Sequence, residues 1–206
     1  MNAPEPAKDI YTHGHHESVL LSHTSRTAQN SAAYLIPYLT PGLRVLDIGA
    51  GPGTITTDFA RLVSPGEVVG VDQSEDVVGI ARKFGAELPN LRFEVGDVYA
   101  LEFADNSFDV VHAHQVLQHL SDPVAALLEM ARVTKPGGVV ACREADFHGM
   151  HWFPESESMT RWMDLYQSVA RHNNAEPDGG RHLIHWAHAA GLLEVKNGRA
   201  SCGGKV

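Results

Sequence analysis

The ten residues VLDIGAGPGT, from Val45 to Thr54, combine an apolar run, one acid and three glycines at alternate positions. The apolar run predicts a buried strand, and the glycines predict a turn whose main chain a ligand can touch. In an open parallel sheet, ligands bind at the carboxyl ends of the strands. We therefore expect a strand, a ligand-binding turn and a helix in this order.

The segments that follow repeat the alternation of strand and helix. Strands are predicted at 67–72, 91–97, 108–114 and 137–145, and helices at 54–63, 74–87 and 122–135. This order predicts an α/β fold: a Rossmann-like, doubly wound, mainly parallel sheet with helices on both faces. Two helices, 155–174 and 179–191, and a sixth strand, 192–201, are expected to follow.

The N-terminal part has a different pattern. Helical spacing of apolar residues from Val19 to Leu39 predicts a helical N-terminal cap. Pro41 and Gly42 then break the helix. We expect a tail and helical cap over residues 1–40 and the main domain over residues 41–206.

Composition narrows the class of protein and its partners. The 206 residues carry 16 Lys and Arg against 25 Asp and Glu, a formal net charge of −9, with no basic stripe, which argues against nucleic acid. Two cysteines fit a reducing compartment. No apolar run reaches the roughly 20 residues that span a bilayer, and the N-terminus does not resemble a secretory signal. We expect a cytoplasmic protein with no membrane partner.

The glycine turn also limits the ligand. A dinucleotide fingerprint reads G-x-G-x-x-G, whereas Thr54 stands here where the third glycine belongs. The carboxylate of Asp47 would repel a pyrophosphate and attract an ammonium group. A nucleoside with a cationic amino-acid tail therefore suits the turn better than the weaker alternative, a nicotinamide dinucleotide.

Two further acids end the next two predicted strands. Asp72 could accept hydrogen bonds from both ribose hydroxyls, and Asp97 could accept one from the exocyclic amino group of adenine. Either acid alone is equally explained as a helix cap or a turn former. Three acids at successive strand ends favour a common ligand.

The ordered motifs VLDIGAGPGT, VVGVDQS, FEVGDVYALEFADNSFDVVHAHQVLQHLSDP and LLEMARVTKPGGVV resemble those of the class I S-adenosylmethionine-dependent methyltransferases, in the ubiquinone-biosynthesis-like branch. The resemblance is close over residues 40 to 145. It implies S-adenosylmethionine as cofactor and S-adenosylhomocysteine as product. It places the methionine end of the cofactor on Asp47, Gly49, Ala50, Gly51 and Gly53, the ribose on Asp72 and Gln73, the adenine on Asp97 and Val98, and the side nearest the methyl group on His114 and Gln115.

Histidines are the candidate proton acceptors. His119 lies where the resemblance places the acceptor, so it could be a general base, although it could instead only order its loop. His114 is the second catalytic candidate, because the resemblance places it beside the methyl group of the cofactor. The 13 histidines show no zinc-helix spacing, and we expect no metal. Candidate acceptor-binding residues are Tyr11, His15, His148 and Trp152, the last of which could instead be core.

The family sheet has seven strands, whereas this sequence ends before a segment that could supply the last one. Three accounts fit this: the sequence is a truncated form of a longer protein, a partner chain supplies the missing strand, or the domain is reduced and does something other than methylation. A homodimer is a separate expectation for the assembly. We expect a methyltransferase that acts on a small organic acceptor through oxygen, nitrogen or carbon. The alternative is a non-catalytic S-adenosylmethionine-binding or regulatory partner on the same fold.

Overall fold

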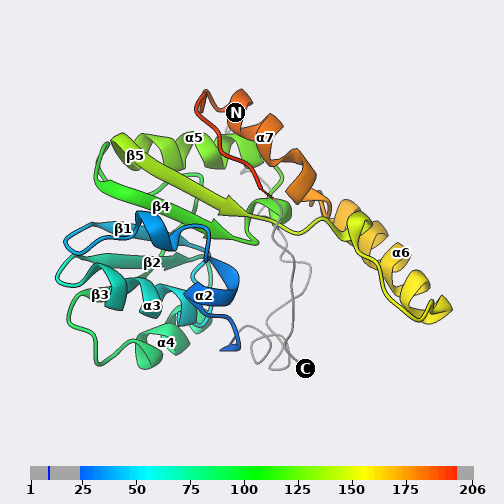
Figure 1. Cartoon of the computed structure of the whole chain (residues 1–206), viewed down its shortest axis with the longest axis horizontal. Helices are drawn as coiled ribbons and strands as arrows, with labels where there is room; N and C mark the ends of the chain where they lie inside the picture. The colour runs from blue at the N-terminus through cyan, green and yellow to red at the C-terminus, as the bar shows by residue number, and fades with distance from the viewer. Residues whose placement is uncertain (1–8, 10–23, 199–206) are drawn as a thin grey trace, which may run out of the picture.

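The computed structural model describes residue 9 and residues 24–198, and these contain one parallel sheet (Figure 1). Its strand order is β3-β2-β1-β4-β5, and every neighbouring pair is parallel. The strands are β1 Val45–Ile48, β2 Val68–Asp72, β3 Leu91–Val95, β4 Phe108–His114 and β5 Thr134–Arg143. The order reverses at β1, so the predicted α/β fold is confirmed.

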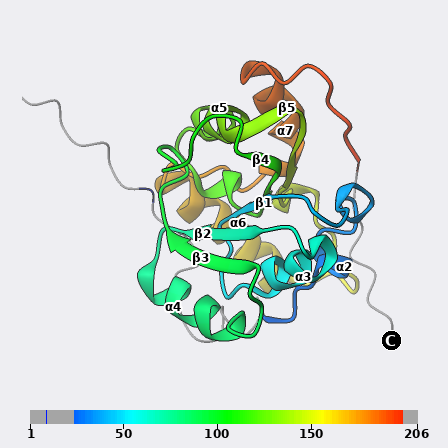
Figure 2. The same ribbon diagram turned by 90° about the vertical axis from the view of Figure 1, so that its left-hand side faces the viewer.

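Helices cover both faces of the sheet, as Figures 1 and 2 show. One face carries α3 and α4, with the short α2 against α3, and the other face carries α5, against which α7 packs. Their bounds are α2 Ala28–Ser31, α3 Thr54–Val63, α4 Glu75–Phe84, α5 Pro123–Val133 and α7 Gly179–Ala189. This is the doubly wound arrangement that right-handed crossovers produce.

Alternate residues of the strands fill two cores. Val45 packs with Phe59 of α3, whereas Leu46 and Ile48 pack with Met130 of α5. Because side chains of a strand point alternately to the two faces, one apolar strand can serve both cores.

Polar side chains fix where the helices begin. Ser74 caps α4 by accepting from the amide of Val77, and Asp122 caps α5 by accepting from the amide of Ala125. Pro123 suits the first position of α5, where no amide hydrogen is needed. These local signals are why both helices begin within a residue of the predicted position.

Beyond β5, the chain leaves the sheet. The 3-10 helix η3, Phe147–Gly149, leads into α6, Glu157–His172, which projects away from the sheet (Figure 1). Two more 3-10 helices are η1, Ile36–Tyr38, and η2, Leu117–His119. None of the described helices has the length and apolar character needed to cross a membrane.

Three details differ from the predictions. Residues 192–198 form no strand; instead they cross from α7 towards η1, where Nζ of Lys196 donates to the Tyr38 hydroxyl at 3.2 Å. The predicted cap before residue 24 lies outside the described residues; between Thr27 and Leu39 the chain forms two short helices, α2 and η1, in place of a single one, since Pro37 starts a new turn. β5 begins at Thr134, three residues early, with an irregular register opposite Phe108 to Val110.

Candidate active site

The glycine turn follows β1 and leads into α3. Gly49, Gly51 and Gly53 have φ angles of +65°, +56° and +85°, in the left-handed region that favours glycine. A Cβ on Gly49 would collide with Val116, and one on Gly53 would lie 2.6 Å from Phe93, so packing also requires both. In front of Gly51, by contrast, the nearest atom to an added Cβ is 4.0 Å away. A ligand can therefore approach the main chain at Gly51.

The carboxylate of Asp72, at the end of β2, braces this turn. One oxygen accepts from the amide of Gly51 at 3.1 Å, and the other accepts from the amide of Ser74 at 3.1 Å. Asp72 thus joins the ends of β1 and β2, and the α4 cap is Ser74 rather than Asp72 itself. The exposed Gln73 lies between them.

Asp47 lies beneath the turn and is buried, with 3% of its surface exposed. One oxygen accepts from the hydroxyl of Thr56 at 2.6 Å, and the other is 2.7 Å from Nδ1 of His112. The rings of Phe59 and His112 are perpendicular, with their centroids 5.0 Å apart. Hydrogen bonds to both oxygens thus offset the cost of burying the Asp47 carboxylate between the sheet and α3.

The third predicted acid, Asp97, is exposed after β3. It accepts from the amide of Tyr99 at 2.9 Å, while the neighbouring Val98 is buried in the α5 core. The hydroxyl of Tyr99 donates to Asp9 at 2.8 Å and accepts from the amide of Asp122 at 3.1 Å. Asp9 is thus attached beside this strand end.

The end of β4 lies next to the glycine turn. His114 is buried there above His112, with their rings parallel and 6.4 Å apart. Gln115 takes a φ of +55°. Its side-chain oxygen accepts from the guanidinium of Arg26 at 2.6 Å. Arg26 was not predicted from the sequence, because nothing in its local pattern distinguishes it.

Glu144, which follows β5, organises the loop that carries His119. It accepts from the amides of Val116 at 3.0 Å, Leu117 at 2.9 Å and Gln118 at 3.4 Å. Burial raises the pKa of Glu144 to about 8. This acid was also missed, because the predicted strand, 137–145, extended past it, whereas β5 ends at Arg143.

The buried side chain of Gln118 connects the segment after β5 to His119. Its oxygen accepts from the amide of Ala145 at 2.9 Å, so its nitrogen is the group that faces Nε2 of His119, at 3.1 Å. His119 itself is 8% exposed. An amide donor at Nε2 favours the neutral His119 tautomer that carries its proton on Nδ1.

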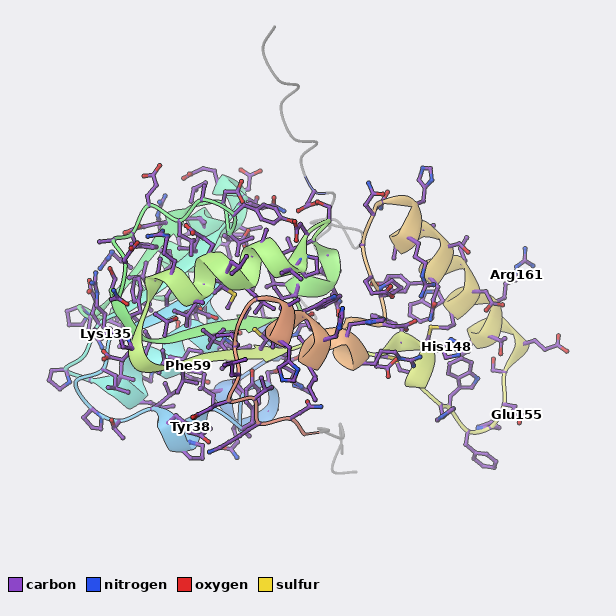
Figure 3. The ribbon with its side chains drawn as sticks, turned by 90° about the horizontal axis from the view of Figure 1, so that it is seen from above. Tyr38, Phe59, Lys135, His148, Glu155 and Arg161 are labelled. Carbon is purple, nitrogen blue, oxygen red and sulfur yellow. The ribbon has the colours of Figure 1, made fainter. Side chains whose placement is uncertain are left out.

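The predicted acceptor residues are distributed more widely. His148 is exposed at the base of α6 (Figure 3), and its amide donates to Asp178 at 2.7 Å. Trp152 is half-buried against Phe147 and Met163. Tyr11 and His15 lie outside the described residues. The structure therefore brings the cofactor candidates together at the carboxyl ends of the strands and leaves the two described acceptor candidates, His148 and Trp152, apart from them.

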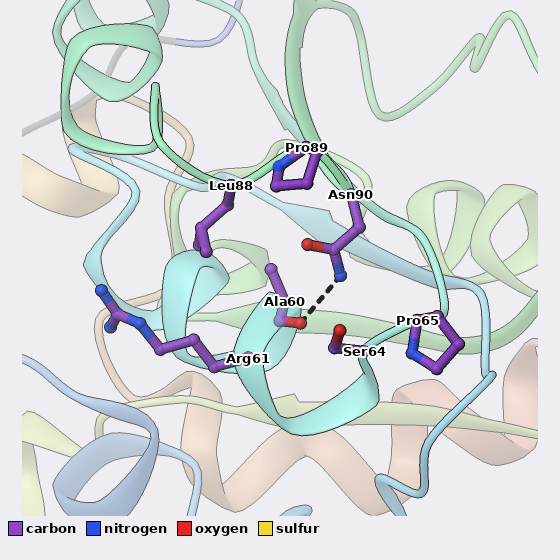
Figure 4. Close-up of a pocket in the computed structure, with 7 residues that line it drawn as sticks. All are labelled: Ala60, Arg61, Ser64, Pro65, Leu88, Pro89 and Asn90. Atoms are coloured by element: carbon purple, nitrogen blue, oxygen red, sulfur yellow. Dashed lines mark hydrogen bonds between the residues drawn. The ribbon is translucent and has the colours of Figure 1, made fainter.

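One open hollow lies elsewhere, between the end of α3 and the start of β3 (Figure 4). The side-chain amide of Asn90 crosses it, donating to the carbonyls of Ala60 at 2.8 Å and Gly66 at 2.7 Å. These are the amino ends of the strands, opposite the glycine turn. Among the described residues, no group of three or more histidines, cysteines or acids could hold a metal ion.

Residues 39–194 match the methyltransferase domain family. The chain belongs to this family. It is 40% identical over 187 residues to an uncharacterized methyltransferase of Schizosaccharomyces pombe, a match that covers 86% of this chain and 66% of that protein. It is also 40% identical over 104 residues to demethylmenaquinone methyltransferase of Staphylococcus aureus, covering 50% of this chain and 43% of that protein.

A solved methyltransferase from Bacillus halodurans has the same fold, with a TM-score of 0.60 at 23% identity over 77% of this chain and 67% of that chain. These likenesses confirm the resemblance to the class I S-adenosylmethionine-dependent methyltransferases, and the Staphylococcus aureus match agrees with the predicted branch. The chain spans less than two thirds of the length of the curated relatives it matches.

Proposed function

We propose that this chain binds S-adenosylmethionine at the carboxyl ends of β1 to β4 and transfers its methyl group to a small organic acceptor. The observation that carries the proposal is Gly51, which combines a positive φ, open space before its Cα and an amide bound to Asp72. A side chain at position 51 would fill the place where a ligand meets the main chain. Family membership supports the choice of cofactor.

The acids suit the charge of this cofactor. Asp72, at the end of β2, is placed to accept hydrogen bonds from the ribose hydroxyls. Asp97 and Val98, just after β3, are placed to border the adenine. Asp47 adds a buried negative charge below the turn, which favours the cationic methionine end. The two donors on Asp47, from Thr56 and His112, make this charge tolerable inside the domain.

The cofactor supplies a methyl group on a sulfonium that is already a good leaving group. The chain's own residues then have to align the acceptor and exclude water. His114 is buried beside Gln115 at the end of β4, where we place the methyl end. His119 is the candidate base, and to take a proton at Nε2 it would have to release the Gln118 amide.

The acceptor is a small molecule with an oxygen, nitrogen or carbon nucleophile. Tyr11, His15, His148 and Trp152 are proposed to contact it. Trp152 adds a flat apolar surface, which favours an acceptor of that character.

Calorimetric titration of the purified chain with S-adenosylhomocysteine tests the proposal. We expect micromolar affinity, about −8 kcal/mol. Gly51→Val and Asp72→Ala should abolish or strongly weaken binding. Gly79→Val is the matched control, because Gly79 lies on α4 with open space before it and away from the strand ends.

Two outcomes would change the interpretation. A folded chain that does not bind S-adenosylhomocysteine, or that binds it equally well with Gly51→Val, would contradict the proposed site. Binding without turnover of any acceptor in a substrate screen would support the non-catalytic alternative.

A further inference from the structure

We infer that two copies of this chain pack against each other through α6. The contact is an apolar stripe on this helix, formed by the side chains of Met159, Trp162, Leu165 and Val169. None of the residues proposed to bind the cofactor or the acceptor lies on α6, so the inference does not depend on the proposed function.

The stripe is exposed in the single chain. Its four side chains are 41%, 46%, 62% and 42% exposed, in the order of the sequence. Trp162, Leu165 and Val169 follow one another after three and four residues, which is the spacing along one side of a helix that packs on another helix. Contiguous apolar surfaces of this kind mark contacts with other molecules, whereas scattered apolar side chains are ordinary.

A different side of α6 attaches the helix to its own domain. Met163 and Ala170 are buried there. The side chain of Gln167 donates to Asp178 at 3.3 Å, and the guanidinium of Arg171 lies 2.9 Å from the same carboxylate. These contacts hold α6 in place without using the stripe.

The direction of α6 lets a second molecule reach the stripe. The helix projects away from the sheet in Figure 1. Arg161, one turn before Leu165 and therefore on the same side of the helix, points away from the sheet in Figure 3. A partner can therefore approach α6 from outside the domain.

The charges of α6 favour a second copy whose helix runs antiparallel to the first. Glu157 lies in the first turn of α6, and Arg171 and His172 lie in the last. An antiparallel pair places the acidic end of each helix beside the basic end of the other and sets the two helix dipoles in opposite directions. A parallel pair would place like charges together. The helix is thus complementary to a reversed copy of itself.

The position of Leu165 suits the two-fold symmetry of such a pair. An isologous contact uses the same surface on both copies, so a residue on the symmetry axis meets itself. Leu165 lies at the middle of α6. With the axis beside it, Trp162 of one copy lies against Val169 of the other, and the two leucines are enclosed between them.

Sedimentation equilibrium of the purified full chain tests the inference. One pair of 16-residue helices is a small interface, so we expect a monomer–dimer equilibrium with a Kd of about 1–100 μM. Leu165→Asp should raise this Kd by a factor of about ten or more, because it places two carboxylates together on the symmetry axis. Leu128→Asp is the matched control, since it changes a 52% exposed leucine on α5, and it should leave the Kd within about twofold of the wild type.

Cysteine cross-linking gives a second measurement. In Leu165→Cys the two new thiols face each other across the axis. A short bismaleimide, which adds one thiol to each of its two double bonds, should link them into a covalent dimer. Leu128→Cys and the wild type, with its own Cys142 and Cys202, are the controls and should stay at the mass of one chain on a denaturing gel.

Both substituted leucines are more than half exposed, so all variants should melt within a few degrees of the wild type. A monomer at every concentration would mean that a second copy does not cover the stripe, and would overturn the inference. A dimer that Leu165→Asp does not weaken and that Leu165→Cys does not link would overturn it as well, because the two copies would then meet through another surface.

Discussion

Glu144→Gln should change how the stability of this protein depends on pH. The carboxyl group of Glu144 accepts from three successive amides of the loop after β4, and the two shorter bonds, from Val116 and Leu117, end on the same oxygen. A glutamine side chain of the same shape can keep those two bonds through its own carbonyl oxygen. It cannot ionise, so the substitution isolates the effect of charge.

The direction follows from burial, which raises the pKa of Glu144 from 4.5 to about 8. Between these two values the folded protein holds a proton that the unfolded chain has released. The free energy of unfolding of the wild type should therefore fall as the pH rises through this window. The slope for one group is at most about 1.4 kcal/mol per pH unit, so two pH units correspond to a loss of up to ~3 kcal/mol.

Urea denaturation followed by tryptophan fluorescence at pH 5.5, 6.5 and 7.5 measures this loss. The difference between wild type and Glu144→Gln is the informative quantity, because the other titrating groups are common to both. Burial also raises the pKa values of the nearby Tyr34 and Cys142, which places them above this pH range. A difference that stays constant with pH would refute the reasoning. Glu144→Ala, which leaves the amides without an acceptor, should cost about 3 kcal/mol throughout.

Three further substitutions, one of them with a matched control, test the fold around the site by thermal and urea denaturation. Gly53→Ala should lower the free energy of unfolding by about 2 kcal/mol, because alanine is strained at a φ of +85° and its Cβ would collide with Phe93. The control Gly79→Ala in α4 should stabilise the protein slightly, because its Cβ meets no other atom. A larger loss of stability for Gly79→Ala than for Gly53→Ala would contradict this account. Phe59→Ala should cost about 3–5 kcal/mol, since this ring is fully buried, and a loss under 1 kcal/mol would show that the α3 core can collapse. Tyr99→Phe should cost about 1 kcal/mol through its bonds to Asp9 and Asp122, and an unchanged midpoint would mean that they add nothing to stability.

The sheet and its main helices could be predicted because their signals are local. Apolar runs mark each strand, and Ser74 and Asp122 mark two helix starts within the segments they cap. The predictions failed where tertiary contacts decide the conformation. Residues 192–198 have a strand-like composition, yet Lys196 contacts the hydroxyl and the ring of Tyr38 in η1, 158 positions earlier in the chain.

The site divides in the same way. That acids would stand at the ends of β1, β2 and β3 follows from the strand boundaries alone. What each acid contacts does not, because the partners come from distant parts of the chain. Arg26 lies 89 positions before Gln115, and only the folded chain shows that the two side chains meet. The sequence around Arg26 carries no sign of this contact.

The buried pair Asp47 and His112 shows how some of these distant contacts could be predicted from the sequence. β1 and β4 bury side chains on both faces of the sheet. The hydrophobic pattern alone therefore does not determine how these two strands are aligned. In the observed register Asp47 lies directly opposite His112, and both side chains point to the α3 face. A shift by one residue would send His112 to the α5 face and remove a donor from a buried carboxylate, which costs more than the apolar residues could recover. Polar residues within otherwise apolar neighbouring strands are therefore the positions to pair first, and here that pairing sets the register beneath the proposed cofactor site.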